Sequence, residues 1–256
     1  MLLTHRWKAL PVALWLAACA TPVSAAEINH KPWDELTEKY VAGGRVDYAG
    51  VATDRQLLSV YLVSLREADP SQLPSKQARL AFWINAYNAC VFKGVLDHQP
   101  ITSVKDVKGF FDRLTYRVAG RDLTLNEMEG AGRALGDWRI HFAVVCASAS
   151  CPPIRSEAYN AEWLDAQLTE QAKSFLANRQ DGLRIDGSTL WVSSVFKWYA
   201  NDFMQGKVTA DSLAAVLEPY LSPDILQAIR GKKLALKFLT YDWALNSRAA
   251  QPPEAR

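Results

Sequence analysis

The sequence predicts an α+β fold: a single domain in which several helices pack on a small, mostly antiparallel sheet with hairpins. Long segments with apolar residues three and four positions apart indicate amphipathic helices. Short β-prone runs on either side of Ala119-Gly120 and of Asp186-Gly187 indicate hairpins. The helices and strands do not alternate strictly, as a parallel sheet would require, so a mixed α+β arrangement is favoured.

Length and composition allow one sizeable core. The chain has 256 residues, of which 49% are hydrophobic and 22% charged, and this balance excludes a disordered protein. No repeat or low-complexity block interrupts residues 30–246, which we take as one globular domain. Residues 247–256, which end in QPPEAR, are expected to form a disordered tail.

Seven segments have the spacing of helices, and Pro32 stands near the start of the first. The longest is SKQARLAFWINAYNACVFKGVLD, and the clearest amphipathic pattern is that of AEWLDAQLTEQAKSFLANR. In LNEMEGAGRAL the glycines at 130 and 132 weaken the helix by roughly 1 kcal/mol each relative to alanine. Helices are therefore expected over residues 32–41, 54–68, 75–97, 125–135, 161–179, 209–221 and 222–230.

Strands are expected in the remaining β-prone segments. Residues 114–125 and 183–193 are the two hairpins, and residues 235–246 begin like a strand. The run HFAVVCA, residues 141–147, is rich in β-branched and aromatic residues and is expected to be a buried strand.

The first 25 residues have the pattern of a signal peptide. Arg6 and Lys8 precede an apolar run over residues 9–18, and Val-Ser-Ala at 23–25 suits cleavage. The run is too short for a permanent membrane helix, which needs about 20 apolar residues. Leu-Ala-Ala-Cys ending at Cys19 also resembles a lipobox, which would give a lipid anchor on Cys19. We expect an exported protein, in the periplasm or otherwise outside the cytoplasm, with membrane tethering as a lipoprotein as the alternative.

The charge of the mature chain argues against one class of partner. Removal of residues 1–25 takes two of the 29 basic residues and none of the 27 acidic ones, so the net charge falls close to zero. A neutral domain without a basic run lacks the electrostatic footprint of a nucleic-acid-binding protein. We therefore expect no nucleic-acid partner.

The stretch RIHFAVVCASASCPPI, residues 139–154, concentrates the reactive side chains and leaves three interpretations open. The small residues ASAS let the chain reverse, which would bring Cys151 back beside Cys146 for a disulfide, as export permits. The same reversal could bring Cys151 to His141 as a nucleophile. His141 itself would lie about 16 Å from Cys146 along a regular strand. A zinc site with these three ligands is disfavoured because no fourth ligand is apparent, and neither a metal nor another cofactor is expected.

A thiol nucleophile needs a base and a group that orients the base. We assign Cys151 as nucleophile, His141 as base, and Asn85 or Asp242 as the orienting group, with Cys146 beside them and the backbone amides of ASAS as oxyanion donors. A histidine held in the core by a backbone carbonyl is the alternative for His141. The residues expected to bind substrate are Trp83, Asn88, Glu127, Ser150 and Trp198.

The polar residues within apolar segments have a structural alternative. Asn85 and Asn88 are poor residues for a helix interior, and they could equally satisfy the backbone of neighbouring loops. The segments SSVFKWYANDF and TYDWALN mix aromatic and polar residues that could line a pocket or simply fill the core. The residues concerned are Lys197, Trp198, Asp202, Asp242, Trp243 and Asn246.

Six motifs occur in a familiar order: VDYAGV, LAFWINAYNA, LTLNEMEG, RIHFAVVCASASCPPI, SSVFKWYANDF and YDWALN. Over residues 45–246 the chain resembles the bacterial and plant family called domain of unknown function 547, which implies no established substrate or reaction. The resemblance implies that the following residues stand at motif positions of the family: Trp83, Asn85, Asn88, Glu127, His141, Cys146, Ser150, Cys151, Pro152, Trp198 and Asp242. Where the family typically reads NEIEH this chain has NEMEG, so Gly130 replaces a histidine. If that histidine belongs to a site in the family, this protein has either lost the activity or relies on His141.

Together these features predict a thiol-dependent hydrolase or acyl transferase with papain- or transglutaminase-like chemistry. Its partner would be a small-molecule or peptide-like envelope substrate with an amide bond. The alternative is a non-enzymatic envelope module that binds another envelope protein or a glycan, with Cys146 and Cys151 as a structural disulfide. Thiol–disulfide exchange is a weaker third interpretation, because redox pairs usually occur as CxxC.

Overall fold

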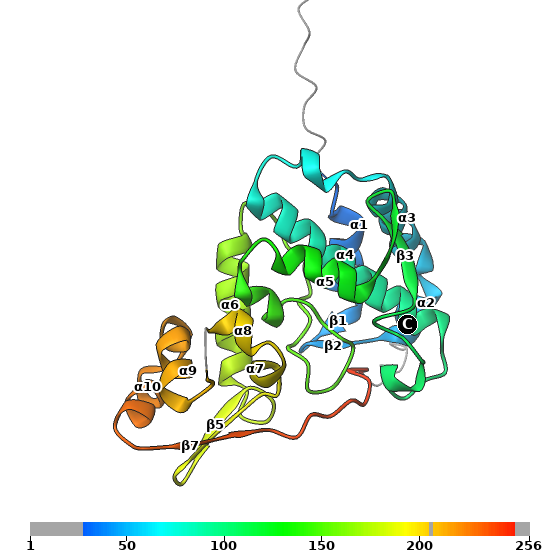
Figure 1. Cartoon of the computed structure of the whole chain (residues 1–256). Coiled ribbons are helices and arrows are strands. Elements are labelled where there is room, and N and C mark those ends of the chain that lie inside the picture. The colour runs from blue at the N-terminus through cyan, green and yellow to red at the C-terminus, as the bar shows by residue number, and fades with distance from the viewer. Residues whose placement is uncertain (1–27, 205–206, 249–256) are drawn as a thin grey trace, which may run out of the picture.

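The computed structural model describes residues 28–204 and 207–248 (Figure 1). The predicted signal peptide, the lipobox at Cys19 and most of the predicted tail lie outside the described residues. The helices are α1 (Lys31–Tyr40), α2 (Tyr48–Thr53), α3 (Arg55–Glu67), α4 (Lys76–Asp97), α5 (Leu125–Arg133), α6 (Leu164–Ala177), α7 (Val195–Trp198), α8 (Ala200–Phe203), α9 (Ala210–Leu217) and α10 (Pro223–Arg230). The strands are β1 (Val41–Ala42), β2 (Arg45–Val46), β3 (Thr115–Val118), β4 (Arg121–Thr124), β5 (Leu183–Asp186), β6 (Thr189–Val192) and β7 (Ala235–Phe238). The predicted α+β class is confirmed.

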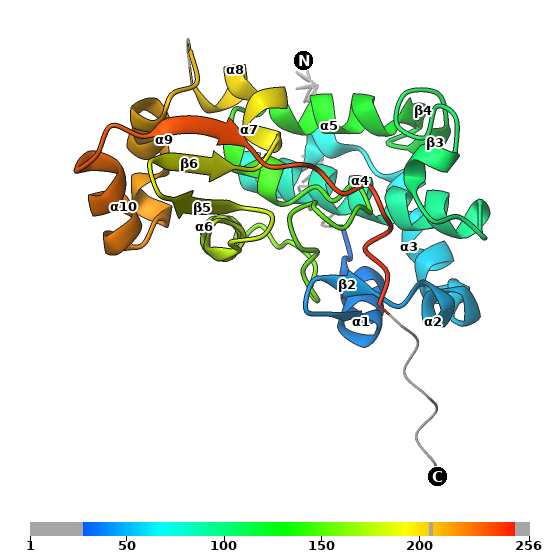
Figure 2. The same ribbon diagram turned by 90° about the horizontal axis from the view of Figure 1, so that it is seen from below.

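Helix α4 is the centre of the larger of two hydrophobic clusters. It begins where the Ser75 hydroxyl accepts from the Ala78 amide at 3.0 Å, and its side chains are buried on nearly every face. Helices α2, α3 and α5 pack against it, and Figure 2 shows α4 between α5 and the pair α1 and α2. A helix that is apolar all round needs such cover on every side, so α4 organises the domain.

The second cluster joins α6 and α7–α10 to a sheet of order β5-β6-β7. Strands β5 and β6 form the predicted hairpin, with Gly187 at φ 59° in its turn, while β7 pairs with β6 in parallel. The hairpin β3–β4 is also present as predicted. Among the described residues the hairpins belong to separate small sheets rather than to one shared sheet.

The prediction of a strand over residues 141–147 is wrong. A 3₁₀ helix, η3 (Trp138–Phe142), begins where Asp137 accepts from the Arg139 amide, and an irregular segment follows it. The Asn88 side chain pairs with this segment instead of a neighbouring strand: it donates to Ala143 O at 2.9 Å and accepts from Val145 N at 2.8 Å. An apolar run indicates that a segment is buried but not which groups its backbone pairs with. For this reason the apolar pattern alone gave a wrong prediction of a strand.

The last described segment, red in Figures 1 and 2, runs from β7 back across the molecule. Residues 239–248, which we call the C-terminal strap, form isolated bridges that join Ala244 to Ser103, Leu245 to Ser148, and Ser247 to Val46. The strap therefore ties the second cluster to loops of the first. None of the helices within residues 28–204 and 207–248 combines the length and apolar character needed to cross a membrane.

Candidate functional site

The loop that carries the two cysteines reverses direction within six residues. Ala147 has a positive φ of 57° and is completely buried, and the Cys151 amide donates to Ser148 O at 3.2 Å. The reversal places Cys151 Sγ 3.1 Å from Cys146 Sγ and 3.0 Å from the Cys146 amide, which donates to it. A disulfide would need about 2.05 Å. Both cysteines, like Cys90, are free thiols here.

The C-terminal strap holds this loop in place. The Ala149 amide donates to Ala244 O at 2.7 Å, the Ser150 amide donates to Asp242 O at 3.2 Å, and the Asp242 amide donates to Ser150 Oγ at 3.0 Å. Because the amides of Ala149 and Ser150 are already committed to backbone oxygens, these two of the four ASAS amides are not available as the oxyanion donors that we expected. The loop is instead anchored rigidly by these bonds.

Cys146 is the more acidic of the two thiols. Cys151 Sγ and the hydroxyls of Ser148 and Tyr241 lie 3.1, 2.9 and 3.1 Å from Cys146 Sγ, so all three groups can donate to a Cys146 thiolate. These hydrogen bonds, that from Cys151 foremost, outweigh burial and lower the pKa of Cys146 to about 7. Burial and the donated bond raise the pKa of Cys151. Cys146 is therefore partly ionised at neutral pH, whereas Cys151 stays a thiol.

His141 is held by a carboxylate rather than by a cysteine. Its Nε2 lies 2.7 Å from Asp202 Oδ2, and Arg133 donates two hydrogen bonds to the same carboxylate at 2.6 and 2.9 Å. Tyr199 stacks on the imidazole with ring centroids 3.9 Å apart. The expected contact between His141 and Cys151 does not form, because the imidazole turns its Nε2 to α8 while Cys151 turns back to Cys146.

The electrostatics of this cluster define the state of the imidazole. Burial lowers the pKa of His141 to about 4, and the hydrogen bond from Arg133 lowers that of Asp202 to about 2. At neutral pH a neutral imidazole faces a carboxylate, so Nε2 carries the proton and donates it to Asp202. Nδ1 is then a proton acceptor, and this buried atom has no hydrogen-bond partner among the described residues.

A pocket of about 290 Å³ joins the thiols to the imidazole. Cys146, Cys151 and His141 all line it, together with Glu129 of α5. Its remaining walls are mainly aromatic, and the rings involved are Tyr87, Phe111, Trp198, Tyr199, Tyr241 and Trp243. Trp198 is 47% exposed, so the pocket communicates with solvent at this ring.

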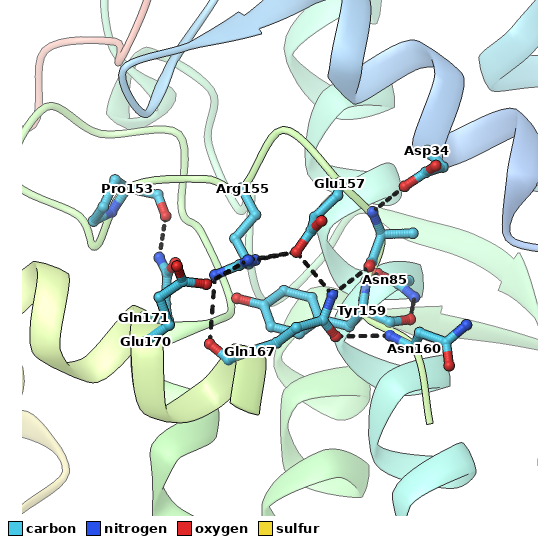
Figure 3. Close-up of polar contacts among 11 residues, drawn as sticks. Asp34, Asn85, Pro153, Arg155, Glu157, Tyr159, Asn160, Gln167, Glu170 and Gln171 are labelled. Carbon is cyan, nitrogen blue, oxygen red and sulfur yellow. Dashed lines mark hydrogen bonds and ion pairs between the residues drawn. The ribbon is translucent and has the colours of Figure 1, made fainter. Parts of the chain in front are cut away.

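Two larger cavities, of about 570 and 610 Å³, lie on either side of residues 153–160. Figure 3 shows that the charged groups there neutralise one another: Arg155 pairs with Glu157 and with Glu170, the latter at 2.8 Å. Asn85 fastens the same segment through two hydrogen bonds to the backbone of Tyr159, at 2.8 and 2.9 Å. This network fixes the segment that follows the cysteines.

The structure separates the predicted site residues into two groups. Cys146, Cys151, His141 and Trp198 share the pocket. Neither predicted orienting residue reaches His141: Asn85 binds the Tyr159 backbone, and the Asp242 carboxylate accepts from the Ala244 amide at 2.9 Å. The orienting position is occupied by Asp202, for which the sequence indicated only a place beside Trp198.

The predicted substrate-binding residues other than Trp198 lie outside the lining of this pocket. Trp83 is buried in α4 and packs edge-on against Phe82, and Asn88 serves the backbone after η3. Glu127 closes the capping box of α5 with Thr124, and Ser150 donates to Asp181 at 2.8 Å. These four side chains stabilise loops, helix ends or the core.

Sequence reasoning missed four residues of the site: Glu129, Arg133, Tyr199 and Tyr241. For Glu129 the sequence offered one signal, because this residue follows the apolar Met128 in a short predicted helix. The structure buries both side chains. Gly130, the departure from the family pattern, is exposed, and a Cβ there would meet nothing within 4 Å. The pairing of His141 with Asp202 is complete without a side chain at this position.

No metal site accompanies these groups in the part of the chain that the structure describes, where no three or more His, Cys, Asp or Glu side chains gather as ligands. In particular, His141, Cys146 and Cys151 do not converge in the way that the zinc interpretation required. The pocket is thus a thiol and imidazole site with aromatic walls.

The fold and pocket define an α+β protein with a close pair of thiols beside a carboxylate-anchored histidine. Residues 70–176 match the family model described as "Protein of unknown function, DUF547", so this part of the chain is similar to that family. The matched region includes both thiols, His141 and Glu129, and it ends before Asp202 and Tyr241. No curated protein and no solved structure matches the chain.

Proposed function

We propose that this protein is a cysteine-dependent hydrolase or acyl transferase that acts on an amide or peptide-like substrate in the cell envelope. The observation that carries the proposal is that one pocket is lined by a thiol of lowered pKa and by a neutral imidazole anchored on Asp202. Cys146 replaces Cys151 as the nucleophile, because the reactive species is the thiolate. Export, by a signal peptide or as a lipoprotein, is part of the proposal.

The reaction would proceed in two steps. Cys146 Sγ attacks the carbonyl carbon to form a thioester, the carbon–nitrogen bond breaks, and the leaving nitrogen takes a proton from His141. That proton comes from the Cys146 thiol, which passes it to His141 Nδ1 as the nucleophilic thiolate forms. In the second step a water molecule or an amine attacks the thioester and gives a proton to His141 Nδ1. The carbon–sulfur bond breaks, and His141 returns this proton to Cys146 Sγ, which restores the thiol. Asp202 stabilises the transient imidazolium and fixes its tautomer.

Proton exchange between His141 and Cys146 requires a bridging group, since the two are not hydrogen bonded to each other. The pocket of about 290 Å³ has room for the reacting group of a substrate between them. Hydrogen bonds at catalytic sites are often completed only when substrate is bound. The unpaired Nδ1 atom supports this role for His141.

The contact of 3.1 Å between the sulfurs favours a second candidate, thiol–disulfide exchange. In that reaction Cys146 attacks a substrate disulfide and Cys151 then displaces the mixed disulfide. The protein gives up two electrons and two protons, and the substrate disulfide becomes two thiols. Cys151 is indispensable for exchange, whereas acyl transfer at Cys146 needs it only as a hydrogen-bond donor.

Acylation by p-nitrophenyl acetate, followed by peptide mapping, separates the candidates. We expect an acetyl group on Cys146 in the wild type and in Cys151→Ser, and none in Cys146→Ser. Buried Cys90, whose burial raises its pKa, is the internal control and should stay unmodified. Recovery of Cys146 and Cys151 only as one linked peptide, with no acetyl group on Cys146, would overturn acyl transfer and support exchange or the structural disulfide.

The pH profile of iodoacetamide labelling tests the assignment of the nucleophile. Labelling of Cys146 should rise with a midpoint near pH 7, as its pKa predicts. Cys151→Ala removes the principal donor and should raise this midpoint by about 1 pH unit, the equivalent of about 1.4 kcal/mol. Cys151→Ser keeps a donor and should shift it less. Faster labelling of Cys151 than of Cys146 at pH 7 would contradict the assignment.

A further inference from the structure

Glu129 is a buried acid that the proposed acyl transfer does not use. Its side chain comes from α5 and lines the pocket of the two thiols, yet the residue is only 7% exposed. Oε2 accepts a hydrogen bond from the Tyr199 hydroxyl at 3.2 Å, whereas Oε1 has no partner among the described residues. A buried carboxyl oxygen without a partner has lost its hydrogen bonds to water, and a bound donor would supply the missing one.

The charges around the pocket favour a cation in that position. No lysine or arginine is among the described residues that line the pocket. Two cations contact its aromatic residues: Arg133, which lies over the Tyr199 ring, forms an ion pair with Asp202, and Lys105 lies 4.4 Å from the centre of the Trp243 ring. The thiolate of Cys146 would add a further negative charge to the pocket.

The aromatic walls suit the same kind of ligand. Trp198, Tyr241 and Trp243 form a cluster with ring centroids 4.7 to 5.8 Å apart, and all three line the pocket. The faces of tryptophan and tyrosine attract ammonium groups within about 6 Å of the ring. A pocket lined both by these rings and by an unpaired carboxyl is complementary to an organic cation and not to an anion.

We propose that the pocket binds a substrate through a primary ammonium group, such as a lysine side chain or the amino terminus of a peptide, with Glu129 Oε1 as its counter-ion. This inference rests on the proposed function and narrows its substrate class to amine-bearing peptides or acyl acceptors. Burial raises the pKa of Glu129, and an ammonium group beside it would favour the ionised form again.

Charge-selective alkylation of Cys146 tests the counter-ion. The rates of modification by 2-bromoethylammonium, iodoacetamide and iodoacetate are measured by peptide mapping and divided by the rates with glutathione. In the wild type we expect the cationic reagent to be favoured several-fold over the neutral one, and the anionic reagent to be slowest. Glu129→Gln should abolish most of the preference for the cation.

Glu127→Gln is the matched control, because Glu127 lies on the same helix, forms the capping box and does not line the pocket. This variant should keep the preference of the wild type. A second measurement uses the wild type alone: n-butylammonium should slow iodoacetamide labelling of Cys146 more than n-butanol or butyrate does. An equal preference in wild type and Glu129→Gln, or equal protection by butanol, would overturn the inference.

Failure of ammonium binding can be distinguished from failure of the proposed acyl transfer. If Cys146 is acetylated by p-nitrophenyl acetate but shows no preference for cations, acyl transfer stands and the amine substrate is excluded. If the preference for cations is present but no acetyl group forms on Cys146, the pocket binds amines without acyl transfer.

Discussion

Helix α4 and the thiol pocket differ in whether their buried polar atoms have hydrogen-bond partners. On α4, the amide groups of Asn85 and Asn88 each form one donated and one accepted hydrogen bond with the backbone of a loop. At the pocket, Glu129 Oε1 and His141 Nδ1 are buried without a partner among the described residues. All four residues are less than 10% exposed, so burial alone does not distinguish them.

The difference indicates two roles for polar groups in one domain. A fully paired amide stabilises the loop that it binds, and its removal leaves backbone groups unsatisfied. An unpaired atom costs stability in the free protein and is retained where a ligand or a proton can use it. Substitutions in the two regions should therefore have opposite effects on the free energy of unfolding.

The largest effect is expected at α4. Asn88→Leu has a side chain of similar size but leaves Ala143 O and Val145 N without partners, so the free energy of unfolding should fall by about 3 kcal/mol. Urea unfolding measures this change. Asn201→Leu, at an exposed position on α8, is the control and should change the free energy by less than about 0.5 kcal/mol. Equal effects of the two substitutions would contradict the structural role of Asn88.

A comparable effect should follow from acidification at His141. Its pKa is lowered from 6.5 to about 4 in the folded protein, so below pH 6.5 the unfolded chain binds the proton more readily. The stability that depends on a neutral His141 is thus present above pH 6.5 and is lost as the pH falls towards 4, by roughly 2–3 kcal/mol.

Urea unfolding at pH 7.5 and pH 4.5 checks this dependence. His141→Gln should reduce the loss between the two pH values. His30, whose pKa burial also lowers to about 4, acts in the same window, so His30→Gln gives the contribution of a second histidine for comparison. The assignment fails if His141→Gln leaves the difference between the two pH values unchanged.

A smaller effect of opposite sign is expected at Glu129. Glu129→Gln removes a buried acid and keeps an acceptor for the Tyr199 hydroxyl, so the free energy of unfolding at pH 8 should rise by about 1 kcal/mol. Glu127→Ala on the same helix breaks a capping box and should lower it by about 1 kcal/mol. Thermal unfolding of both variants measures the contrast. A loss of stability in Glu129→Gln would remove the distinction between the two regions.

The smallest changes concern the glycines of α5, near the pocket. At Gly130 a new Cβ meets nothing within 4 Å, so Gly130→Ala should raise the free energy of unfolding by about 0.5–1 kcal/mol. At Gly132 the Cβ would lie 2.5 Å from Ile140 Cδ1, and Gly132→Ala should lower it by about 1 kcal/mol or more. Urea unfolding should give opposite signs, and a gain at both positions would show that η3 shifts freely.

The success and failure of sequence reasoning follow the range of the interactions involved. Helix α4 and the hairpins β3–β4 and β5–β6 were predictable, because periodicity and turn residues act within a few positions. The reversal that brings Cys151 back to Cys146 was expected from the small residues between them and is confirmed by their contact. The prediction of a strand over residues 141–147 was wrong. The backbone there pairs with the side chain of Asn88, which lies 55 residues from Ala143 and 57 residues from Val145 along the chain.

The sequence by itself determined the fold class, the central helix and the meeting of the two thiols, since each depends on local spacing and on burial of apolar side chains. Only the tertiary structure decided that Asp202 and not Asn85 or Asp242 holds His141, and that Cys146 is the more acidic thiol. Asp202 lies 61 residues from His141, and Tyr241 lies 95 residues from Cys146. Contacts over such separations depend on how the two hydrophobic clusters and the C-terminal strap pack, and no local pattern in the sequence records them.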